Sequence, residues 1–300
     1  MPRKGVRSTY SQCPVQIRMH DGAGLCSTAT AFFYVHAGNW CLITNGHNFS
    51  GKHFLTKEPL TLGRLPTYIE LHISTYLGSP PYLPETPFTT ISARVEIYRD
   101  YQPVWFEHPA LGSVCDVVAL PLERPEKCPP FMHNAANLIS NTKIPVKPGC
   151  TSFVIGFPRS LSVGFGLPLW KSGYIASEPH YDVSIGGEMA PIGGLAGGTT
   201  IPAFFIDTQT REGMSGSPVF AAYTGTWDTT DPYRDFNPAS AEFWTRDDIA
   251  MGATAMEFVG CYSGRVGRTE EGAALGLCWR ADVIDAICAA KVVAKHPHIV

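Results

Sequence analysis

The chain has 300 residues, of which 44% are hydrophobic and 16% charged, a composition that excludes intrinsic disorder and suits one large or two modest domains. The formal net charge of −3, with His neutral, excludes the broad basic surface of a nucleic-acid-binding protein. No window approaches the roughly 18 consecutive apolar residues that indicate a transmembrane helix, and the N-terminal segment lacks the apolar stretch of a signal peptide. We therefore expect neither a nucleic-acid nor a membrane partner.

Residues 1–12 are expected to form a flexible arm. Short runs rich in branched and aromatic residues follow, bounded by turn residues, and this pattern is typical of strands. These runs are TATAFFYVHA, NWCLITNG, YIELHISTYL, ISARVEIYRD and VCDVVALPL. Between the first two, Ala37, Gly38 and Asn39 predict a tight hairpin turn. The four prolines of residues 78–87 predict a loop.

Proline density and polarity predict that residues 122–148 connect two halves of the chain, 13–135 and 136–300. Strand patterns then resume in CTSFVIGFP, SVGFGLPLWKSGYIA, PAFFIDTQ, SGSPVFAAY, TAMEFVGCYSG and GAALGLCWR. The polar stretch 223–255 predicts a long surface loop with a short helix near 238–244. A helix is expected over 282–296, capped by Asp282 and ended by Pro297. By pattern alone, the fold is an all-β barrel or sandwich pair.

Nine cysteines occur, an odd number without any CxxC pair, which favours buried reduced thiols over a disulfide framework or a zinc site. They are Cys13, Cys26, Cys41, Cys115, Cys128, Cys150, Cys261, Cys278 and Cys288. Reduced thiols and the lack of an export signal lead us to expect a cytoplasmic protein.

The segment REGMSGSPVF, residues 211–220, places Ser215 among glycines. Gly213 and Gly216 permit a tight turn and close backbone approaches that other residues resist. The N–H groups of Gly213 and Ser215 could then point at one spot and form an oxyanion hole. The alternative is an ordinary glycine–serine turn, because Gly-x-Ser-Gly is a short motif.

Two further segments hold groups that can activate a serine. In CLITNGHNFSG, residues 41–51, His47 follows a strand end, from which it can reach a serine on another element; the alternative is a structural histidine. In GSVCDVVALPLE, residues 112–123, Asp116 is a lone carboxylate in an apolar run. Burying it is costly unless it is paired, and a histidine N–H is a suitable partner. The alternative is an aspartate that caps a turn at a strand start.

The order His47, Asp116, Ser215 along the chain is the chymotrypsin order. LITNGHN, SVCDVVALPL and GMSGSPVF resemble the histidine, aspartate and nucleophile motifs of the chymotrypsin/trypsin-like serine peptidases. STATAFFY is similar to the strand that enters the first barrel, and FVGCYSG to the strand that lines the substrate channel. Asn48 and Met214 replace the cysteine and the aspartate of the digestive members, so the pattern is nearer to the HtrA-like, glutamyl-endopeptidase-like and viral branches.

The resemblance covers roughly residues 13–290 and implies two six-stranded antiparallel β-barrels of chymotrypsin type, here followed by the C-terminal helix. It implies a serine endopeptidase that acts on a protein or peptide through an acyl-enzyme on Ser215, without a cofactor or metal. His47 would be the general base and Asp116 would orient it. Two alternatives remain, a non-catalytic protein-binding module on the same fold and an esterase that uses the same triad.

The resemblance also implies a substrate pocket with Gln209 at its base and walls near Thr210, Gly264 and Gly276. Because Gln209 is neutral and glycines leave space, we expect a roomy pocket that prefers a large uncharged side chain. Digestive members become active when a new amino terminus pairs with the aspartate before the nucleophile. Met214 cannot form that ion pair, so we expect the chain to be competent without proteolytic trimming.

Overall fold

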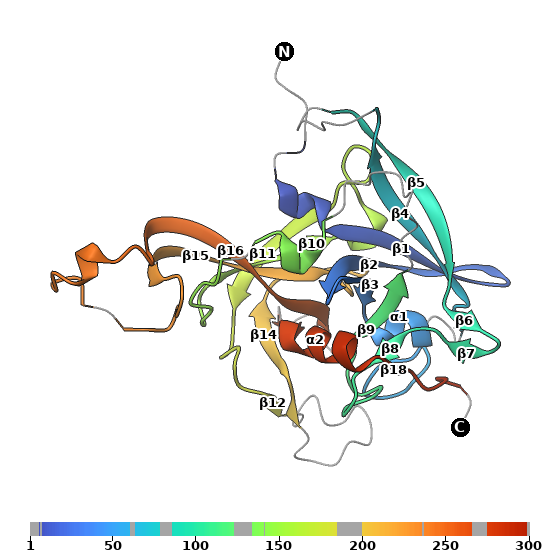
Figure 1. The fold of residues 1–300 in the computed structure, drawn as a ribbon. Coiled ribbons are helices and arrows are strands. Elements are labelled where there is room, and N and C mark those ends of the chain that lie inside the picture. The colour runs from blue at the N-terminus through green and yellow to red at the C-terminus, as the bar shows by residue number, and fades with distance from the viewer. Residues whose placement is uncertain are drawn as a thin grey trace.

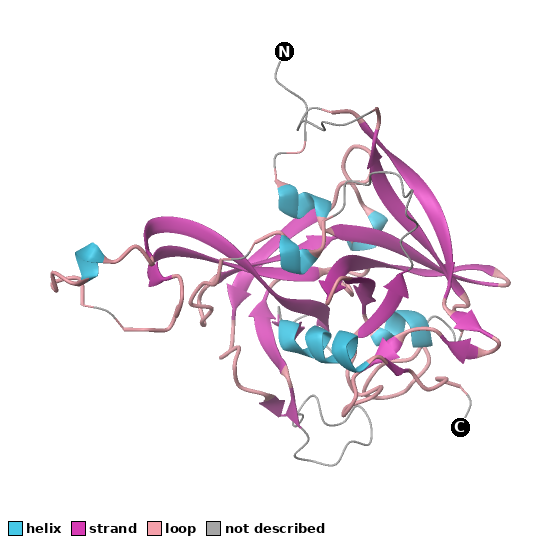
Figure 2. Ribbon diagram, viewed as in Figure 1, coloured by secondary structure: helices cyan, strands magenta, loops and turns pink. Residues whose placement is uncertain are grey.

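The structure is a computed structural model that describes residues 6, 8–60, 64–78, 86–122, 134–140, 142–184, 200–235, 237–265 and 275–298. Most of the loop predicted at 78–87, much of the connection predicted at 122–148 and Cys128 lie outside these ranges. Strands dominate the described part (Figure 2), which confirms the all-β prediction. The longest described helix has ten residues, and none in this part of the chain is long and apolar enough to cross a membrane.

The first half of the chain forms an eight-stranded sheet in the order β18-β8-β9-β3-β2-β1-β4-β5. Its strands are β1 (Pro14–Asp21), β2 (Gly24–His36), β3 (Asn39–Thr44), β4 (Tyr68–Tyr76), β5 (Phe88–Glu96), β8 (Phe106–Glu107), β9 (Val118–Leu122) and β18 (Val292–Val293). A separate ribbon pairs β6 (Tyr98–Arg99) with β7 (Gln102–Pro103). The period-two pattern explains the strands: Val15, Ile17 and Met19 of β1 are all fully buried.

The second half closes into a six-stranded barrel in the order β10-β11-β14-β17-β16-β15. Its strands are β10 (Thr151–Gly156), β11 (Leu169–Ile175), β14 (Ala203–Asp207), β15 (Pro218–Asp228), β16 (Ile249–Arg265) and β17 (Leu275–Arg280), and a small ribbon pairs β12 (Val183–Ser184) with β13 (Thr200–Ile201). The prediction of a six-stranded barrel thus holds for this half. The first half instead contributes seven described strands to an eight-stranded sheet, and the eighth is β18, which returns from the end of the chain and pairs with β8.

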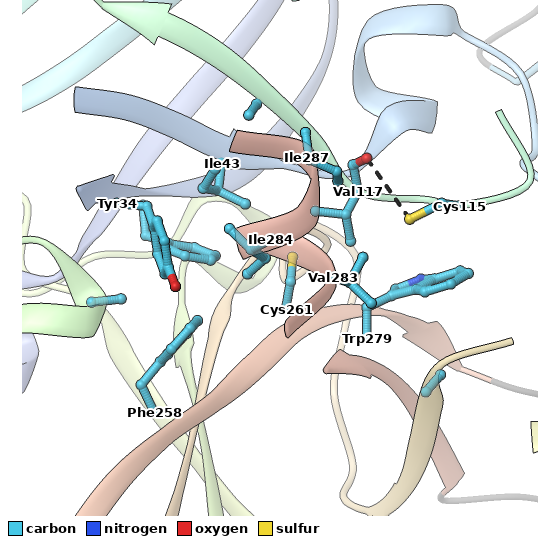
Figure 3. Close-up of a cluster of buried hydrophobic side chains, with 14 of the residues drawn as sticks. Tyr34, Ile43, Cys115, Val117, Phe258, Cys261, Trp279, Val283, Ile284 and Ile287 are labelled. Atoms are coloured by element: carbon cyan, nitrogen blue, oxygen red, sulfur yellow. Dashed lines mark hydrogen bonds between the residues drawn. The ribbon is translucent and has the colours of Figure 1, made fainter. Parts of the chain in front are cut away.

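The core between the halves holds side chains from both and from helix α2 (Ala281–Ala290). Tyr34 and Ile43 come from the first sheet, Phe258 from the second barrel and Ile284 from the helix, and Figure 3 shows these side chains gathered around one another. All four are buried. The shared core therefore fixes the two halves relative to each other, and catalytic groups supplied by different halves can be held in register.

Helix α2 ends at Ala290, six residues before the predicted end at 296. Lys291 adopts a left-handed conformation, φ 52°, and caps the helix, so the chain turns and β18 can reach the first sheet. The predicted division at 136–300 is therefore wrong for Val292 and Val293, which belong to the sheet of the first half.

The structure also corrects the expectations for the N-terminal arm, the hairpin turn, the loop at 223–255 and the helix at 238–244. Residues Thr9–Gln12 of the predicted arm form a 3-10 turn, from which Tyr10 packs edge-on against Phe220 at 4.9 Å between ring centroids. The hairpin turn is made by Ala37 and Gly38 alone, both with positive φ, and Asn39 already belongs to β3.

Much of the predicted loop at 223–255 is strand, since β15 and β16 form a long hairpin that projects from the body (Figure 1) and leaves only 229–248 between them. The predicted helix at 238–244 is a single 3-10 turn, Phe243–Thr245. The remaining 3-10 turns are Ala136–Leu138 and Pro158–Ser160, and a short helix α1 spans Gly46–Ser50.

Candidate active site

His47 stands in the first turn of α1, directly after β3. The strand is anchored by Leu42 and Ile43, both fully buried, and Gly51 ends the helix in a left-handed conformation, φ 65°. Asn48 is buried, whereas the side chain of His47 is 18% exposed. The buried strand and the short helix thus hold the imidazole at the surface, where a substrate can reach it.

Asp116 lies just before β9 and is fully buried. Its Oδ2 lies 2.7 Å from Nδ1 of His47, and its Oδ1 accepts the backbone N–H of the same residue at 2.9 Å. The hydroxyl of Ser263 also donates to Oδ2. Three donors therefore compensate the burial of this carboxylate. Because Nδ1 of His47 faces Asp116, its Nε2 is left to accept a proton.

Ser215 stands in the turn that precedes β15, between two glycines with positive φ, 88° at Gly213 and 83° at Gly216. A Cβ on Gly216 would lie 2.1 Å from the carbonyl oxygen of Thr30, and one on Gly213 would lie 2.5 Å from that of Phe157. Both positions therefore require glycine for conformation and for space. The sequence interpretation of this motif as a tight backbone approach agrees with this geometry.

Ser263, in β16, joins the three predicted catalytic residues. Its hydroxyl donates to Asp116, and its carbonyl oxygen accepts the hydroxyl of Ser215 at 3.1 Å. Among the described residues, that carbonyl is the hydrogen-bond partner of the Ser215 side chain in this structure, in place of His47. Ser263 thus links Asp116, which holds His47, to Ser215, whose hydroxyl is turned toward the Ser263 carbonyl.

Hydrogen bonds to the adjoining carbonyls fix the orientation of two backbone N–H groups at Ser215. The carbonyl of Glu212 accepts the Arg159 N–H at 2.7 Å, and the carbonyl of Met214 accepts the Ser217 N–H at 3.0 Å. In a trans peptide the N–H points away from the C=O, so these bonds orient the N–H groups of Gly213 and Ser215. Neither N–H donates a hydrogen bond to any described residue. This pair is suited to bind an oxyanion.

Met214 is fully buried in the core of the second barrel, together with Ile206 and Val219. Its side chain fills the space beneath the turn that carries Ser215. The packing of the apolar Met214 side chain can therefore order this turn, as the sequence led us to expect.

The predicted pocket residues have mixed environments. Gln209 is exposed, and a Cβ on Gly264 would meet nothing within 4 Å. Thr210 is buried and shares a hydrogen bond with the hydroxyl of Tyr262, whose ring would lie 2.5 Å from a Cβ on Gly276. The ring of Tyr262 thus fills the space between Thr210 and Gly276, and the expectation that Gly276 leaves room for a substrate is wrong.

A cavity of about 670 Å³ adjoins His47 and Asp116 on the side of the first sheet. Ionisable side chains line much of it: Lys52, His53, Lys57, Glu107, His108, Lys295 and His296. Burial lowers the pKa of His53 and raises the pKa of Glu107, because loss of water around a group disfavours its charged form. Within the described ranges, no group of three or more His, Cys, Asp or Glu side chains is arranged to hold a metal.

Sequence reasoning did not identify three residues of this site: Ser263, Tyr262 and Thr30, which is described below. Tyr262 and Ser263 lie in FVGCYSG, a segment interpreted only as a channel strand, and a serine within a strand gives no sign of its hydrogen-bond partner. One other signal was available in the lone carboxylate of Asp116. A buried carboxylate needs more than one hydrogen-bond donor, which pointed to a partner in addition to His47.

No protein-family model matches the chain, and no curated protein sequence matches it. Solved structures of serine proteases do resemble it. The active form of the Rv3671c protease from M. tuberculosis is 14% identical, with 95% of this chain and 83% of that chain covered and a TM-score of 0.43. The HtrA-type protease AlgW with a tripeptide is 11% identical, with 94% and 60% covered and a TM-score of 0.43.

The inactivated protease paralogue S-I1 of the scabies mite is 12% identical, with 95% of this chain and 96% of that chain covered and a TM-score of 0.47. The proteins that this chain resembles thus include both active and inactivated members. Whether this chain is catalytic has to be argued from its own residues.

Proposed function

We propose that the chain is a serine endopeptidase with Ser215 as nucleophile, His47 as general base and Asp116 as the group that orients His47. The observation that carries the proposal is the double contact of the buried Asp116 with His47, at Nδ1 and at the backbone N–H. A buried carboxylate held in this way fixes the tautomer of the imidazole and stabilises its protonated form. The N–H groups of Gly213 and Ser215 form the proposed oxyanion hole.

The reaction follows from these roles. Nε2 of His47 removes the proton of Ser215 as Oγ attacks the carbonyl carbon of the scissile bond. The carbonyl oxygen becomes negative and is bound by the N–H groups of Gly213 and Ser215. His47 then gives its proton to the departing amine, which leaves an acyl-enzyme on Ser215. A water molecule, deprotonated by His47, releases the acid in the same way. No cofactor takes part.

Before the first step, the hydroxyl of Ser215 has to leave the carbonyl of Ser263 and turn toward His47. Rotation about one side-chain bond is a small rearrangement, and catalytic hydrogen bonds often form only once substrate is bound. The same bond to Ser263 is the observation that favours the second candidate, a non-catalytic binding module on this fold.

For the substrate we propose a polypeptide cut after a small uncharged side chain. The predicted pocket residues Gln209, Thr210 and Gly264 carry no charge, which supports an uncharged partner. The ring of Tyr262, which lies against Thr210 and would meet a Cβ on Gly276, would limit the depth of such a pocket, and this supports a small side chain in place of the large one expected from the sequence.

The test is a cleavage profile on a peptide library with wild-type chain, Ser215→Ala and the matched control Ser162→Ala, an exposed serine. We expect wild type and Ser162→Ala to cut the same sites and Ser215→Ala to cut none. Turnover of a p-nitrophenyl ester without any peptide cleavage would assign an esterase. Peptides bound but not cut, with no ester turnover, would assign the binding module.

A further inference from the structure

We propose that Thr30 is a positioning residue that holds the oxyanion-binding turn in its active conformation; this inference rests on the proposed function. Thr30 lies in β2 of the first sheet and is fully buried. Besides its neighbours in its own sheet, it contacts the turn 213–216, which carries Ser215 in the second half. Thr30 thus makes polar contacts between the two halves at the nucleophile.

Thr30 binds this turn at two points. Its hydroxyl donates to the carbonyl of Gly213 at 2.7 Å, and its backbone N–H donates to the carbonyl of Ser215 at 3.0 Å. The same hydroxyl accepts the N–H of Phe157 at 3.1 Å, so both of its hydrogen-bonding roles are used. The hydroxyl therefore links the nucleophile turn to the segment that follows β10.

That segment determines how the oxyanion hole points. After Phe157, the N–H of Arg159 binds the carbonyl of Glu212 at 2.7 Å, and this bond directs the N–H of Gly213 toward the site. Arg159 and Ser160 both have positive φ, 50° and 60°, which is unfavourable for residues with a side chain. Such a conformation persists only where surrounding contacts impose it, and the hydroxyl of Thr30 on Phe157 is one of them.

Gly213 is the residue most able to escape this arrangement, because it has no side chain and positive φ. If its peptide bond to Glu212 turned over, the carbonyl of Glu212 would replace the N–H of Gly213 in the oxyanion hole. A carbonyl there would repel the negative charge of the transition state. Thr30 opposes this change by holding the carbonyl on the other side of Gly213.

The hydrogen bonds of Thr30 also extend toward His47, the proposed general base. The carbonyl of Thr30 accepts the hydroxyl of Thr44 at 2.8 Å, and that hydroxyl accepts the side-chain amide of Asn48 at 2.9 Å. Asn48 follows His47 in α1. The network thus places the oxyanion-binding turn and the general base on one buried set of hydrogen bonds, which favours simultaneous alignment of both.

The experiment compares Thr30→Val, which keeps the shape but removes the hydroxyl, with Thr30→Ser, which keeps the hydroxyl. Thr224→Val is the matched control, since Thr224 also lies on a strand but its hydroxyl bonds to that of Thr254 in the β15–β16 hairpin. Each is assayed with a fluorogenic peptide built on the preferred cleavage site and with a peptide boronic acid of the same sequence, which forms a tetrahedral adduct. Circular dichroism confirms that each variant is folded.

We expect kcat of Thr30→Val to fall on the order of 10²-fold with KM within about twofold, because loss of an oxyanion-hole donor costs about 10²–10³-fold in kcat. The boronic acid should bind more weakly by the same factor. Thr30→Ser and Thr224→Val should stay within about threefold of wild type. A merely structural role of Thr30 would not weaken boronic acid and spare KM together.

A folded Thr30→Val with wild-type kcat and boronic acid affinity would overturn the proposal. If that variant does not fold, Thr30→Ala replaces it. Failure of both to fold, while Thr224→Val folds, would give Thr30 a purely structural role and would also overturn the proposal. Failure of the proposed function is distinct, since then the wild-type chain itself would neither cut peptides nor bind the boronic acid.

Discussion

Asp116→Asn is the substitution whose effect the structure defines most closely. Asp116 accepts three hydrogen bonds: at Oδ1 from the His47 backbone, and at Oδ2 from Nδ1 of His47 and from Ser263. An asparagine has one accepting oxygen and one donating NH₂ group. With the oxygen at the Oδ2 position, the NH₂ meets the backbone N–H of His47. With the oxygen at the Oδ1 position, the NH₂ meets Nδ1 of His47 and the hydroxyl of Ser263.

In the second arrangement His47 has to present an unprotonated Nδ1, so the proton moves to Nε2 and the ring cannot accept the proton of Ser215. In the first arrangement, two donors face each other in a buried site. We therefore expect the rate to fall on the order of 10⁴-fold, equivalent to about 5.4 kcal/mol of transition-state stabilisation. The substitution is nearly isosteric, so the fold should persist.

The assay is the second-order rate of labelling by a fluorophosphonate, which needs no knowledge of the natural substrate. Asp247→Asn, which changes an exposed carboxylate in the hairpin loop, is the matched control and should label at the wild-type rate. Urea unfolding monitors stability. A loss smaller than tenfold in a folded Asp116→Asn would refute the assignment of Asp116 as the group that orients His47.

Four further predictions follow from the same geometry. Ser263→Ala should slow labelling about 10- to 100-fold, since hydrogen bonds to charged groups contribute about 1.5–3 kcal/mol; an unchanged rate would contradict its role. Tyr262→Ala should destabilise the fold by about 3–5 kcal/mol and shift cleavage toward larger side chains; an unaltered cleavage profile would exclude Tyr262 from the pocket. Because Met214 is buried beneath the turn, the intact chain should give burst-phase acylation; an inert chain activated by trimming before Cys13 would oppose this. The eight described cysteines are free, and all but Cys26 are buried, so they should titrate as thiols after denaturation and activity should survive a reducing agent; two or more native disulfides by mass spectrometry would be contrary evidence.

The proposed triad could be assembled from the sequence because each of its proposed members is marked locally. A serine between glycines, a histidine after a buried strand and a carboxylate in an apolar run are patterns visible within about a dozen residues. Their order along the chain then favoured one arrangement over others. The strands of the second barrel were likewise predicted from their apolar runs.

Ser263 and Thr30 escaped prediction because their partners are distant in sequence, 147 residues away for Ser263 and Asp116 and 183 for Thr30 and Gly213. Such contacts exist only once the two halves are packed together. The pocket was wrongly expected to be roomy because glycine shows where a side chain is missing, not which neighbour fills the space. Here the ring of Tyr262, from the adjacent strand, fills it at Gly276.

The long hairpin and the end of α2 were missed for other reasons. Residues 223–228 and 249–255 mix small, polar and apolar side chains, and only Trp227 and Asp228 among them are buried. They therefore lack the continuous apolar runs used to recognise strands, yet their backbones pair along β15 and β16. Lys291 caps α2 in a left-handed conformation, which Gly or Asn adopts most often at a helix end. A lysine at this position therefore did not indicate that the helix ends there.

The most direct test of the central claim is to map the residue that a fluorophosphonate modifies, by intact-mass and peptide mass spectrometry. The account predicts one adduct per chain, located on Ser215, and almost none in His47→Ala, because the serine is a weak nucleophile without its base. Modification at another residue, no adduct in a folded wild-type chain, or equal labelling of His47→Ala would contradict it.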